Sequence, residues 1–338
     1  MRFTKFVGVL AGLSLLTASC GSDDASTGTV PVADEAPEST DAPESTDAAA
    51  STDAPESTDA PETTDAPDDG ADTGAVPSRI ISLSPTHTEM LFAIGAGDQV
   101  VAVDDFSNYP PEAAEKMTDL SGFAPNVEAI ASYEPDLVVT DGTNPDLLEQ
   151  LDSLGIARWE GPAAVTFSDV SAQIEQLGAA TGNVGDAAEL VSSMQTEIDE
   201  ITAGVPERDE PLTYYHELDN TYFSITSETF IGYVYGQLGL RSIADLAEGS
   251  GGPYPQLNAE FILSEDPDLI FLACTTYCGE SVDTVAARDG WDQLSALQNG
   301  LVIELDDDTS SRWGPRIVDF YREVADAVAM AVDAQPVG

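Results

Sequence analysis

The chain has 338 residues, of which 62 are acidic and 11 are basic, so its formal net charge at pH 7 is −51. Such a charge repels phosphate backbones and anionic lipid surfaces, which excludes nucleic acid as a partner and argues against direct binding to a membrane surface. The excess persists beyond Pro77, where 46 acidic residues stand against nine basic ones. It favours solvation in a salty habitat, with an acidic face for a basic partner as the alternative.

Residues 1–19 have the pattern of a signal peptide. Arg2 and Lys5 form a positive start, and the apolar run from Phe6 to Leu16 is too short to span a bilayer. Small residues then lead to Cys20, in a pattern that resembles a bacterial lipobox, where the cysteine is lipidated after cleavage. We therefore expect an exported protein whose only membrane contact is a lipid on Cys20, at the outer face of the cytoplasmic membrane. The alternative is an ordinary signal peptide followed by a chance cysteine.

Residues 20–76 comprise the lipidated cysteine and a low-complexity linker. The unit Asp-Ala-Pro-Glu-Ser-Thr recurs at 41–46 and 53–58, and the tract contains no aromatic residue. It cannot bury enough apolar surface to offset its ordering entropy, so we expect disorder. The tract suits a flexible spacer or a glycosylated stalk, and its composition does not choose between them.

Residues 77–182 alternate between short apolar runs and helical patterns, which predicts an N-terminal lobe with a parallel sheet. The expected strands are 79–83, 100–103, 137–140 and one at Ile156. The expected helices begin at Thr86, cover 127–131 and carry the leucines of 147–154.

The segment 183–206 differs, because its apolar residues fall on one helical stripe from Leu190 to Val205 with acidic residues opposite. It predicts one long bridging helix over 186–205. Residues 207–338 then resume the alternation and predict a C-terminal lobe, with strands at 212–215, 269–273 and 301–305 and helices at 230–238 and 317–332. The predicted fold class is α/β, with two Rossmann-like lobes of mainly parallel strands bridged by one long backbone helix.

Several segments beyond Pro77 form a set that recurs in one family. They are Arg79-Ile-Ile-Ser-Leu-Ser-Pro-Thr-His-Thr-Glu89, Phe106-Ser-Asn-Tyr-Pro-Pro111, Asn126-Val-Glu-Ala-Ile130, Glu134-Pro-Asp-Leu-Val138, Tyr254-Pro-Gln-Leu257, Ala259-Glu-Phe-Ile262, Asp266-Pro-Asp-Leu-Ile270 and Arg312-Trp-Gly-Pro-Arg316. Through these segments, nearly all of the folded part resembles the class III substrate-binding proteins of metal-chelate ABC importers, which take up cobalamin, haem and ferric siderophores, and it is most similar to the cobalamin-binding members. The resemblance implies a monomer that binds one small-molecule metal chelate between its lobes.

The resemblance also implies contact with an ABC permease dimer. In the family, one surface glutamate per lobe docks onto permease arginines, and the matching residues are Glu128 and Glu260. Arginine–carboxylate pairs are directional, so two of them far apart would fix orientation. The alternative is two solvated acids that favour the positive ends of helix dipoles.

Family cleft positions correspond here to aromatic residues, which would offer stiff apolar faces to a flat chelate. As ligand contacts we predict Phe106, Phe123, His87, His216, Phe223, Tyr254, Arg312 and Trp313. Single aromatics could instead be core, and the histidines could simply pack. Asp141 stands where the cobalamin binders have an aromatic residue, which counts against cobalamin itself.

The loops predicted at the cleft are rich in acid. Arg312 and Arg316 stand there against Asp104, Asp105, Asp141, Glu217, Asp219 and Asp306 to Asp308. A strongly anionic triscatecholate would be repelled by that field unless the arginines dominate locally. We therefore expect a neutral or cationic chelate, such as a hydroxamate siderophore or a corrinoid.

Cys274 and Cys278 follow the strand at 269–273 in an exported chain. This placement predicts a local disulfide, and the alternative is that the two cysteines form half of a metal site. Two further functions stay open: binding of bare zinc or manganese through His87, His216, Glu217 or Asp219, and a tethered ligand sensor. No catalytic motif is present, so we expect neither an enzyme nor a cofactor.

Overall fold

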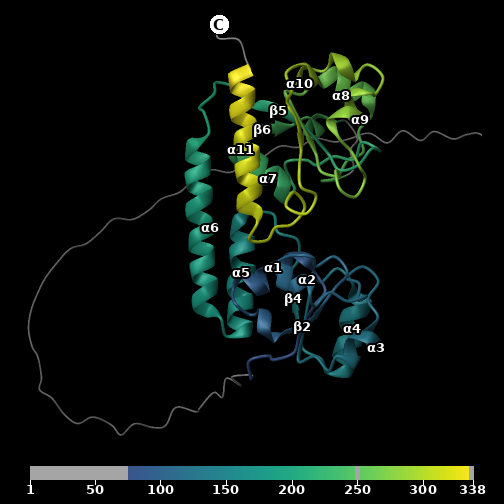
Figure 1. Ribbon diagram of the computed structural model, residues 1–338, viewed down its shortest axis with the longest axis vertical. Helices are drawn as coiled ribbons and strands as arrows, with labels where there is room; N and C mark the ends of the chain where they lie inside the picture. The colour runs from purple at the N-terminus through teal and green to yellow at the C-terminus, as the bar shows by residue number, and fades with distance from the viewer. Residues whose placement is uncertain (1–74, 248–251, 335–338) are drawn as a thin grey trace, which may run out of the picture. The chain divides into compact units, whose positions relative to one another are not determined.

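The computed structural model describes residues 75–247 and 252–334, which belong to one compact unit, Gly70–Gly338 (Figure 1). The predicted signal peptide, Cys20 and nearly all of the linker lie outside the described residues. No helix in the part of the chain that is described has both the length and the apolar character needed to cross a bilayer.

The first lobe is built on a four-stranded parallel sheet of order β2-β1-β3-β4. Its strands are β1 (Ile80–Ser82), β2 (Val100–Val103), β3 (Leu137–Thr140) and β4 (Arg158–Glu160). The helices between them are α1 (Pro85–Ala93), α2 (Pro111–Ala114), α3 (Val127–Ser132) and α4 (Pro145–Leu154), with a 3₁₀ turn at Gly97–Gln99. All residues of β1 and β3 are buried, as expected for central strands covered on both faces.

The second lobe repeats this topology with the order β6-β5-β7-β8, again wholly parallel. Its strands are β5 (Leu212–Glu217), β6 (Leu240–Ser242), β7 (Leu269–Leu272) and β8 (Val302–Glu304). Its helices are α7 (Phe230–Gln237), α8 (Ala259–Glu265), α9 (Val282–Ala286) and α10 (Ser295–Gln298), with 3₁₀ turns at Ile243–Leu246 and Trp291–Gln293. The predicted α/β class with parallel sheets is confirmed.

Three long helices run along one side of both sheets (Figure 1): α5 (Phe167–Thr181), α6 (Val184–Gly204) and α11 (Ile317–Ala334). Helix α6 packs against α5, which follows the first sheet, and against α11, which follows the second. At the first contact the backbones approach closely, since a Cβ on Gly178 would lie 2.4 Å from the Cβ of Ala187. The long helix predicted at 186–205 is therefore present at Val184–Gly204 and touches helices of both lobes.

One apolar core extends through both lobes. A single cluster of buried side chains includes Ile80 of the first sheet, Met194 and Ile198 of α6, and Phe271 of the second sheet. A smaller cluster on the first sheet contains Ile81 and its neighbours. Because the larger cluster is continuous, the lobes share apolar packing along α6 as well as a covalent connection.

The two lobes begin their third strands in the same way. Just beyond α3 and α8 stand Glu134 and Asp266, whose φ angles are 50° and 42°, and each is followed by Pro-Asp-Leu. The carboxylate of Asp136 accepts hydrogen bonds from the backbone amides of Ser78 and Arg79, and that of Asp268 accepts one from the amide of Thr213. These aspartates therefore tie β3 to β1 and β7 to β5.

The strand predicted at Ile156 is wrong by two residues, because β4 begins at Arg158. Gly155 adopts a left-handed conformation with φ of 69° and ends α4. The amide of Ile156 still donates to the carbonyl of Leu151 at 3.0 Å, so this residue belongs to the helix end rather than to the sheet.

Asp104 is a buried carboxyl at the end of β2. Its side chain is 2% exposed, and Oδ1 has no hydrogen-bond partner in the described chain. Burial raises the pKa of Asp104 to about 6, and hydrogen bonding to Ser107 opposes this shift only in part. The protonated carboxyl therefore persists to a higher pH in the native state than in the unfolded chain.

The substitution Asp104→Asn tests whether the pKa of this carboxyl is raised in the folded protein. A carboxyl whose folded pKa is raised adds stability at low pH, and that stability is lost as pH rises through about 6. The free energy of unfolding of the wild type should fall relative to the variant by about 1 kcal/mol from pH 5 to pH 8. Urea titrations of both proteins check this, and their difference cancels the buried histidines, whose lowered pKa acts in the opposite direction. A difference independent of pH would show that Asp104 titrates normally.

Candidate ligand cleft

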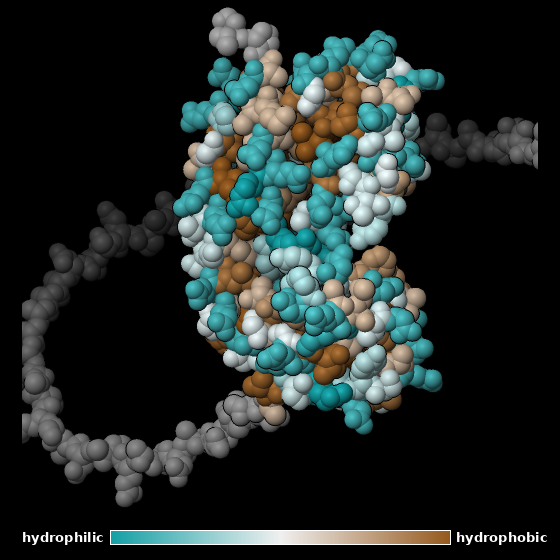
Figure 2. Space-filling model, in the orientation of Figure 1, coloured by the Kyte–Doolittle hydropathy of each residue, from teal (hydrophilic) through white to brown (hydrophobic). Residues whose placement is uncertain are grey.

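The loops that follow the strands of both sheets meet at one cleft. In parallel α/β sheets, ligands bind beyond the carboxyl ends of the strands. Nδ2 of Asn108, in the loop after β2, donates to Oδ2 of Asp308, in the loop after β8, at 2.8 Å. The carboxyl edges of the two sheets therefore face one another, and the surface is hollowed between the lobes on the side away from α6 (Figure 2).

Glu89 of α1 joins the lobes. Its carboxylate is 2% exposed and accepts hydrogen bonds from two arginines of the segment between β8 and α11. Nη1 of Arg312 donates to Oε1 at 2.9 Å, while Nε and Nη2 of Arg316 donate to Oε2 and Oε1 at 2.9 and 2.6 Å. We call these three residues the interlobe lock.

The guanidinium of Arg312 makes all of its described hydrogen bonds within the protein. Besides Glu89, it binds Oδ1 of Asn108 at 2.9 Å, the carbonyl of Phe106 at 3.1 Å and Oδ1 of Asp308 at 2.6 Å. Its side chain is buried among these protein partners. The structure therefore gives Arg312, predicted as a ligand contact, the task of holding the two lobes together.

Trp313 continues the same segment into the first lobe. Its Nε1 donates to Oε1 of Gln173 on α5 at 3.2 Å, and its ring lies edge-on to His87, with centroids 6.1 Å apart. Its ring is partly buried. The predicted ligand contact at Trp313 thus lies in the interlobe contact beside the lock.

The two histidines, predicted as one ligand contact per lobe, are completely buried. The ring nitrogens of His87 lie 2.8 Å from Oγ of Ser84 and 3.0 Å from Oε1 of Gln173. Nδ1 of His216 lies 2.9 Å from the hydroxyl of Tyr235. Burial lowers the pKa to about 4 for His87 and to about 3 for His216, so both rings are neutral at pH 7. The structure favours the alternative that both pack inside their lobes.

The side chains proposed as ligands for bare zinc or manganese are bound to other partners. Among residues 75–247 and 252–334, no group of three or more histidine, cysteine or acidic side chains is arranged to hold a metal ion. Glu217 is instead paired with both terminal nitrogens of Arg288 at 2.6 Å, and Asp219 accepts hydrogen bonds from the amide and hydroxyl of Thr221. The acids proposed as metal ligands therefore serve the local structure.

The predicted aromatic residues of the cleft are exposed rather than core. Phe123 is 84% exposed and contacts Phe106 edge-to-face, with ring centroids 5.9 Å apart. Phe223 and Tyr254 lie on neighbouring segments of the second lobe, which meet in a bridge between Phe223 and Gln256. The large aromatic side chains exposed in the described chain are Phe106, Tyr109, Phe123, Phe223, Tyr254 and Tyr277.

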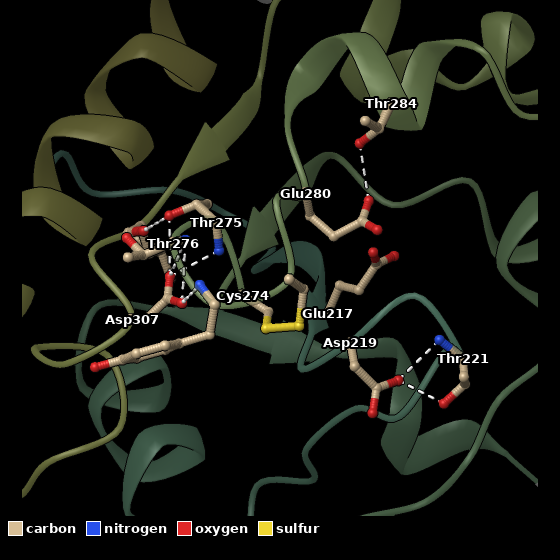
Figure 3. The surroundings of a disulfide bond; sticks show 12 residues. Glu217, Asp219, Thr221, Cys274, Thr275, Thr276, Glu280, Thr284 and Asp307 are labelled. Carbon is tan, nitrogen blue, oxygen red and sulfur yellow. Dashed lines mark hydrogen bonds between the residues drawn. A yellow bond between two sulfur atoms is a disulfide. The ribbon is translucent and has the colours of Figure 1, made fainter. Parts of the chain in front are cut away.

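Sequence reasoning missed Tyr109 and Tyr277. The guanidinium of Arg316 lies 4.2 Å from the centroid of the Tyr109 ring, beside the interlobe lock. Tyr277 stands between Cys274 and Cys278, which form a disulfide in the loop after β7 (Figure 3). Its place between two cysteines, in the loop that follows β7, was the signal that could have identified it.

The two glutamates matched to permease docking occupy equivalent places. Glu128 and Glu260 are exposed and stand at the second residue of α3 and of α8. Asn126 and Asn258 cap these helices with their side-chain oxygens. Each lobe thus presents one carboxylate at a capped helix start, on the helix that precedes its third strand.

Comparison with known proteins agrees with this architecture. The profile of the periplasmic binding protein family (Peripla_BP_2) matches residues 80–309. The uncharacterized ABC transporter substrate-binding lipoprotein YvrC of Bacillus subtilis is 31% identical over 262 residues, which is 75% of this chain and 80% of the relative. A cobalamin-binding protein of Halobacterium salinarum is 30% identical over 262 residues, covering 74% and 69% of the two chains.

Solved structures are also similar. The periplasmic vitamin B12 binding protein BtuF of Vibrio cholerae has a TM-score of 0.63 at 27% identity, covering 76% of this chain and 98% of BtuF. The periplasmic heme-binding protein RhuT of Roseiflexus has a TM-score of 0.68 at 22% identity, covering 76% and 99%, and shares the fold. With these matches over most of its folded part, the chain belongs to the periplasmic binding protein family.

Proposed function

We propose that this chain is the extracytoplasmic receptor of an ABC importer, which captures a metal chelate between its lobes and delivers it to a permease. The observation that carries the proposal is the set of exposed aromatic rings on the cleft loops of both lobes. An exposed ring such as that of Phe123 leaves a large apolar face in water, and a flat or bulky chelate would cover it. Relatives named for cobalamin and heme binding support this ligand class.

The charges of the cleft favour a neutral or cationic chelate, such as a hydroxamate siderophore or a corrinoid. Arg312 and Arg316 were the residues that could have attracted an anion. Arg316 is paired with Glu89, and Arg312 with both Glu89 and Asp308. Asp105 and Asp306 remain exposed on the loops after β2 and β8. Because the cations are neutralised internally, the remaining field at the cleft is negative and would repel a triscatecholate.

Docking and anchoring complete the proposal. Glu128 and Glu260 would meet arginines of a permease dimer, supported by their equivalent exposed positions on the two lobes. Lipidation of Cys20 would keep the receptor at the membrane surface, supported by the lipoprotein name of the Bacillus relative. Residues 21–76 would then act as the tether.

A titration panel tests the ligand class. Purified protein, stripped of bound ligand, is titrated by tryptophan fluorescence with ferrioxamine B, cyanocobalamin and a ferric triscatecholate at low ionic strength. We expect ferrioxamine B or cyanocobalamin to bind at least about tenfold more tightly than the triscatecholate, with the gap narrowing in 0.5 M salt because screening weakens the repulsion. Tighter binding of the triscatecholate would contradict the charge argument.

Phe123→Ala, with Met330→Ala as the matched control, ties that binding to the cleft. Phe123 is exposed on a cleft loop and Met330 is exposed on α11. Loss of an aromatic face from the site should weaken binding about tenfold, whereas the control should match the wild type. Equal effects of the two substitutions would place the ligand elsewhere.

Docking is tested by Glu128→Lys combined with Glu260→Lys. Both side chains are exposed and neither takes part in the contacts of the interlobe lock, so ligand affinity should be unchanged. Uptake of labelled ligand by host cells should fall at least about tenfold, because two attractive pairs become repulsive. Glu149→Lys, on the exposed face of α4, is the control. Full uptake by the double variant would exclude these glutamates from docking.

A further inference from the structure

The loop between β7 and α9 carries an exposed aromatic side chain on a short segment that a disulfide closes. Cys274 and Cys278 close the segment, with Cα atoms 5.1 Å apart, and Tyr277 stands inside it. The Tyr277 side chain is 60% exposed, so it does not belong to the core. An exposed aromatic residue on a covalently closed loop suits a contact surface for something outside the chain.

On one side, the loop 274–278 is held by hydrogen bonds to the carboxylate of Asp307. One carboxylate oxygen accepts hydrogen bonds from the amide and hydroxyl of Thr275 at 2.7 and 2.9 Å, and the other accepts one from the amide of Tyr277 at 3.0 Å. The amide of Thr276 lies 3.2 Å from both oxygens. Three successive amides thus converge on one carboxylate that is 6% exposed (Figure 3).

The back of the loop is held by a buried ionic cluster. The amide of Glu280 donates to the carbonyl of Cys274 at 3.1 Å, which closes the base of the loop. The Glu280 side chain and Glu217 of β5 both bind Arg288, at 2.8 and 2.6 Å. Together with Asp307 and the disulfide, this cluster fixes the loop on both sides without using the Tyr277 ring.

The Tyr277 hydroxyl places the ring at the cleft. It donates to Oδ1 of Asp308 at 3.3 Å, and the same carboxylate accepts hydrogen bonds from Arg312 and from Asn108 of the first lobe. Tyr277 therefore contacts Asp308, which itself belongs to the contact between the lobes. Its ring is exposed to solvent beside that contact.

We propose that Tyr277 is a specificity-determining contact for the bound chelate, and that the Cys274–Cys278 disulfide and Asp307 position its ring before the ligand arrives. The inference rests on the proposed function, because it assigns a further residue to the same cleft. The ligand class it favours has an extended flat or apolar face that can lie on a phenol ring. Holding the ring in advance removes part of the ordering cost of binding.

The experiment is a double-mutant cycle between the ring and the disulfide. Cyanocobalamin, ferrioxamine B and haemin are titrated into the wild type, Tyr277→Ala, the pair Cys274→Ser with Cys278→Ser, and the triple variant. For the probe that binds most tightly, Tyr277→Ala should weaken binding about tenfold. Opening the disulfide should weaken it about threefold, and Tyr277→Ala should then cost only about threefold in the opened protein, since the ring is no longer held.

Controls separate positioning from a general structural effect. Tyr277→Phe keeps the aromatic ring, so its ligand affinity should stay within about threefold of that of the wild type. The affinity of Met330→Ala should equal that of the wild type. Wild-type affinity for Tyr277→Ala would overturn the ligand contact. An equal cost of Tyr277→Ala with the disulfide closed and open would overturn the positioning. If the serine variants fail to fold, reduction of the wild type and of Tyr277→Ala with a phosphine completes the same cycle.

A readout without ligand keeps the inference separate from the proposed function. If the wild type binds none of the three probes, the proposed function fails for these ligands. Positioning is then decided by hydrogen exchange at the amides of Thr275, Thr276 and Tyr277. We expect exchange at least about tenfold slower in the oxidised than in the reduced protein, because the disulfide holds these amides on Asp307. Equal rates would overturn the positioning role.

Discussion

The buried carboxylate of Glu89 is the constraint on which the arrangement of the lobes depends. A carboxylate with 2% exposure must be paired, since burial of an isolated charge costs several kcal/mol. Both of its partners, Arg312 and Arg316, come from the other lobe. Removing one side of such a pair while the other stays buried typically costs about 3–5 kcal/mol, so the closed arrangement of the lobes requires both sides of this contact. The apolar core that continues along α6 acts in the same direction.

This lock also sets the chemistry of the cleft. Because Glu89 and Asp308 neutralise Arg312, that guanidinium is not offered to a ligand, although it lies between the lobes. The loops around it keep exposed acids and exposed aromatic rings. Under the proposed function, a cleft of this kind would select for apolar surface and against negative charge. The same ion pairs that hold the lobes together therefore account for the ligand class that we propose.

Local patterns in the sequence were enough for most strands of the two sheets and for α6, because apolar periodicity and a strand end are read from neighbouring residues. The short strand β6, whose central Arg241 is exposed, was not predicted. Four of the exposed aromatic residues were predicted through the family resemblance, and Tyr109 and Tyr277 were missed. Helix α5 was not predicted, although Thr166 and Asp169 form a capping box at its start. The roles of Arg312 and the histidines could not be derived locally. Arg312 pairs with Glu89 across 223 residues, and no spacing rule identifies such a partner. The buried environment of His87 likewise depends on Gln173, 86 residues away.

The distance between the lobes tests the central claim most directly. Spin labels on cysteines introduced at Glu149 of α4 and Asp283 of α9, both exposed, report that distance by pulsed electron paramagnetic resonance. With Glu89 intact, we predict one narrow distance distribution, unchanged by ligand. With Glu89→Gln, the lock loses its charge and the distribution should broaden toward longer distances. A broad distribution in the protein with Glu89 intact, or the same narrow one in Glu89→Gln, would contradict the claim that this carboxylate fixes the cleft.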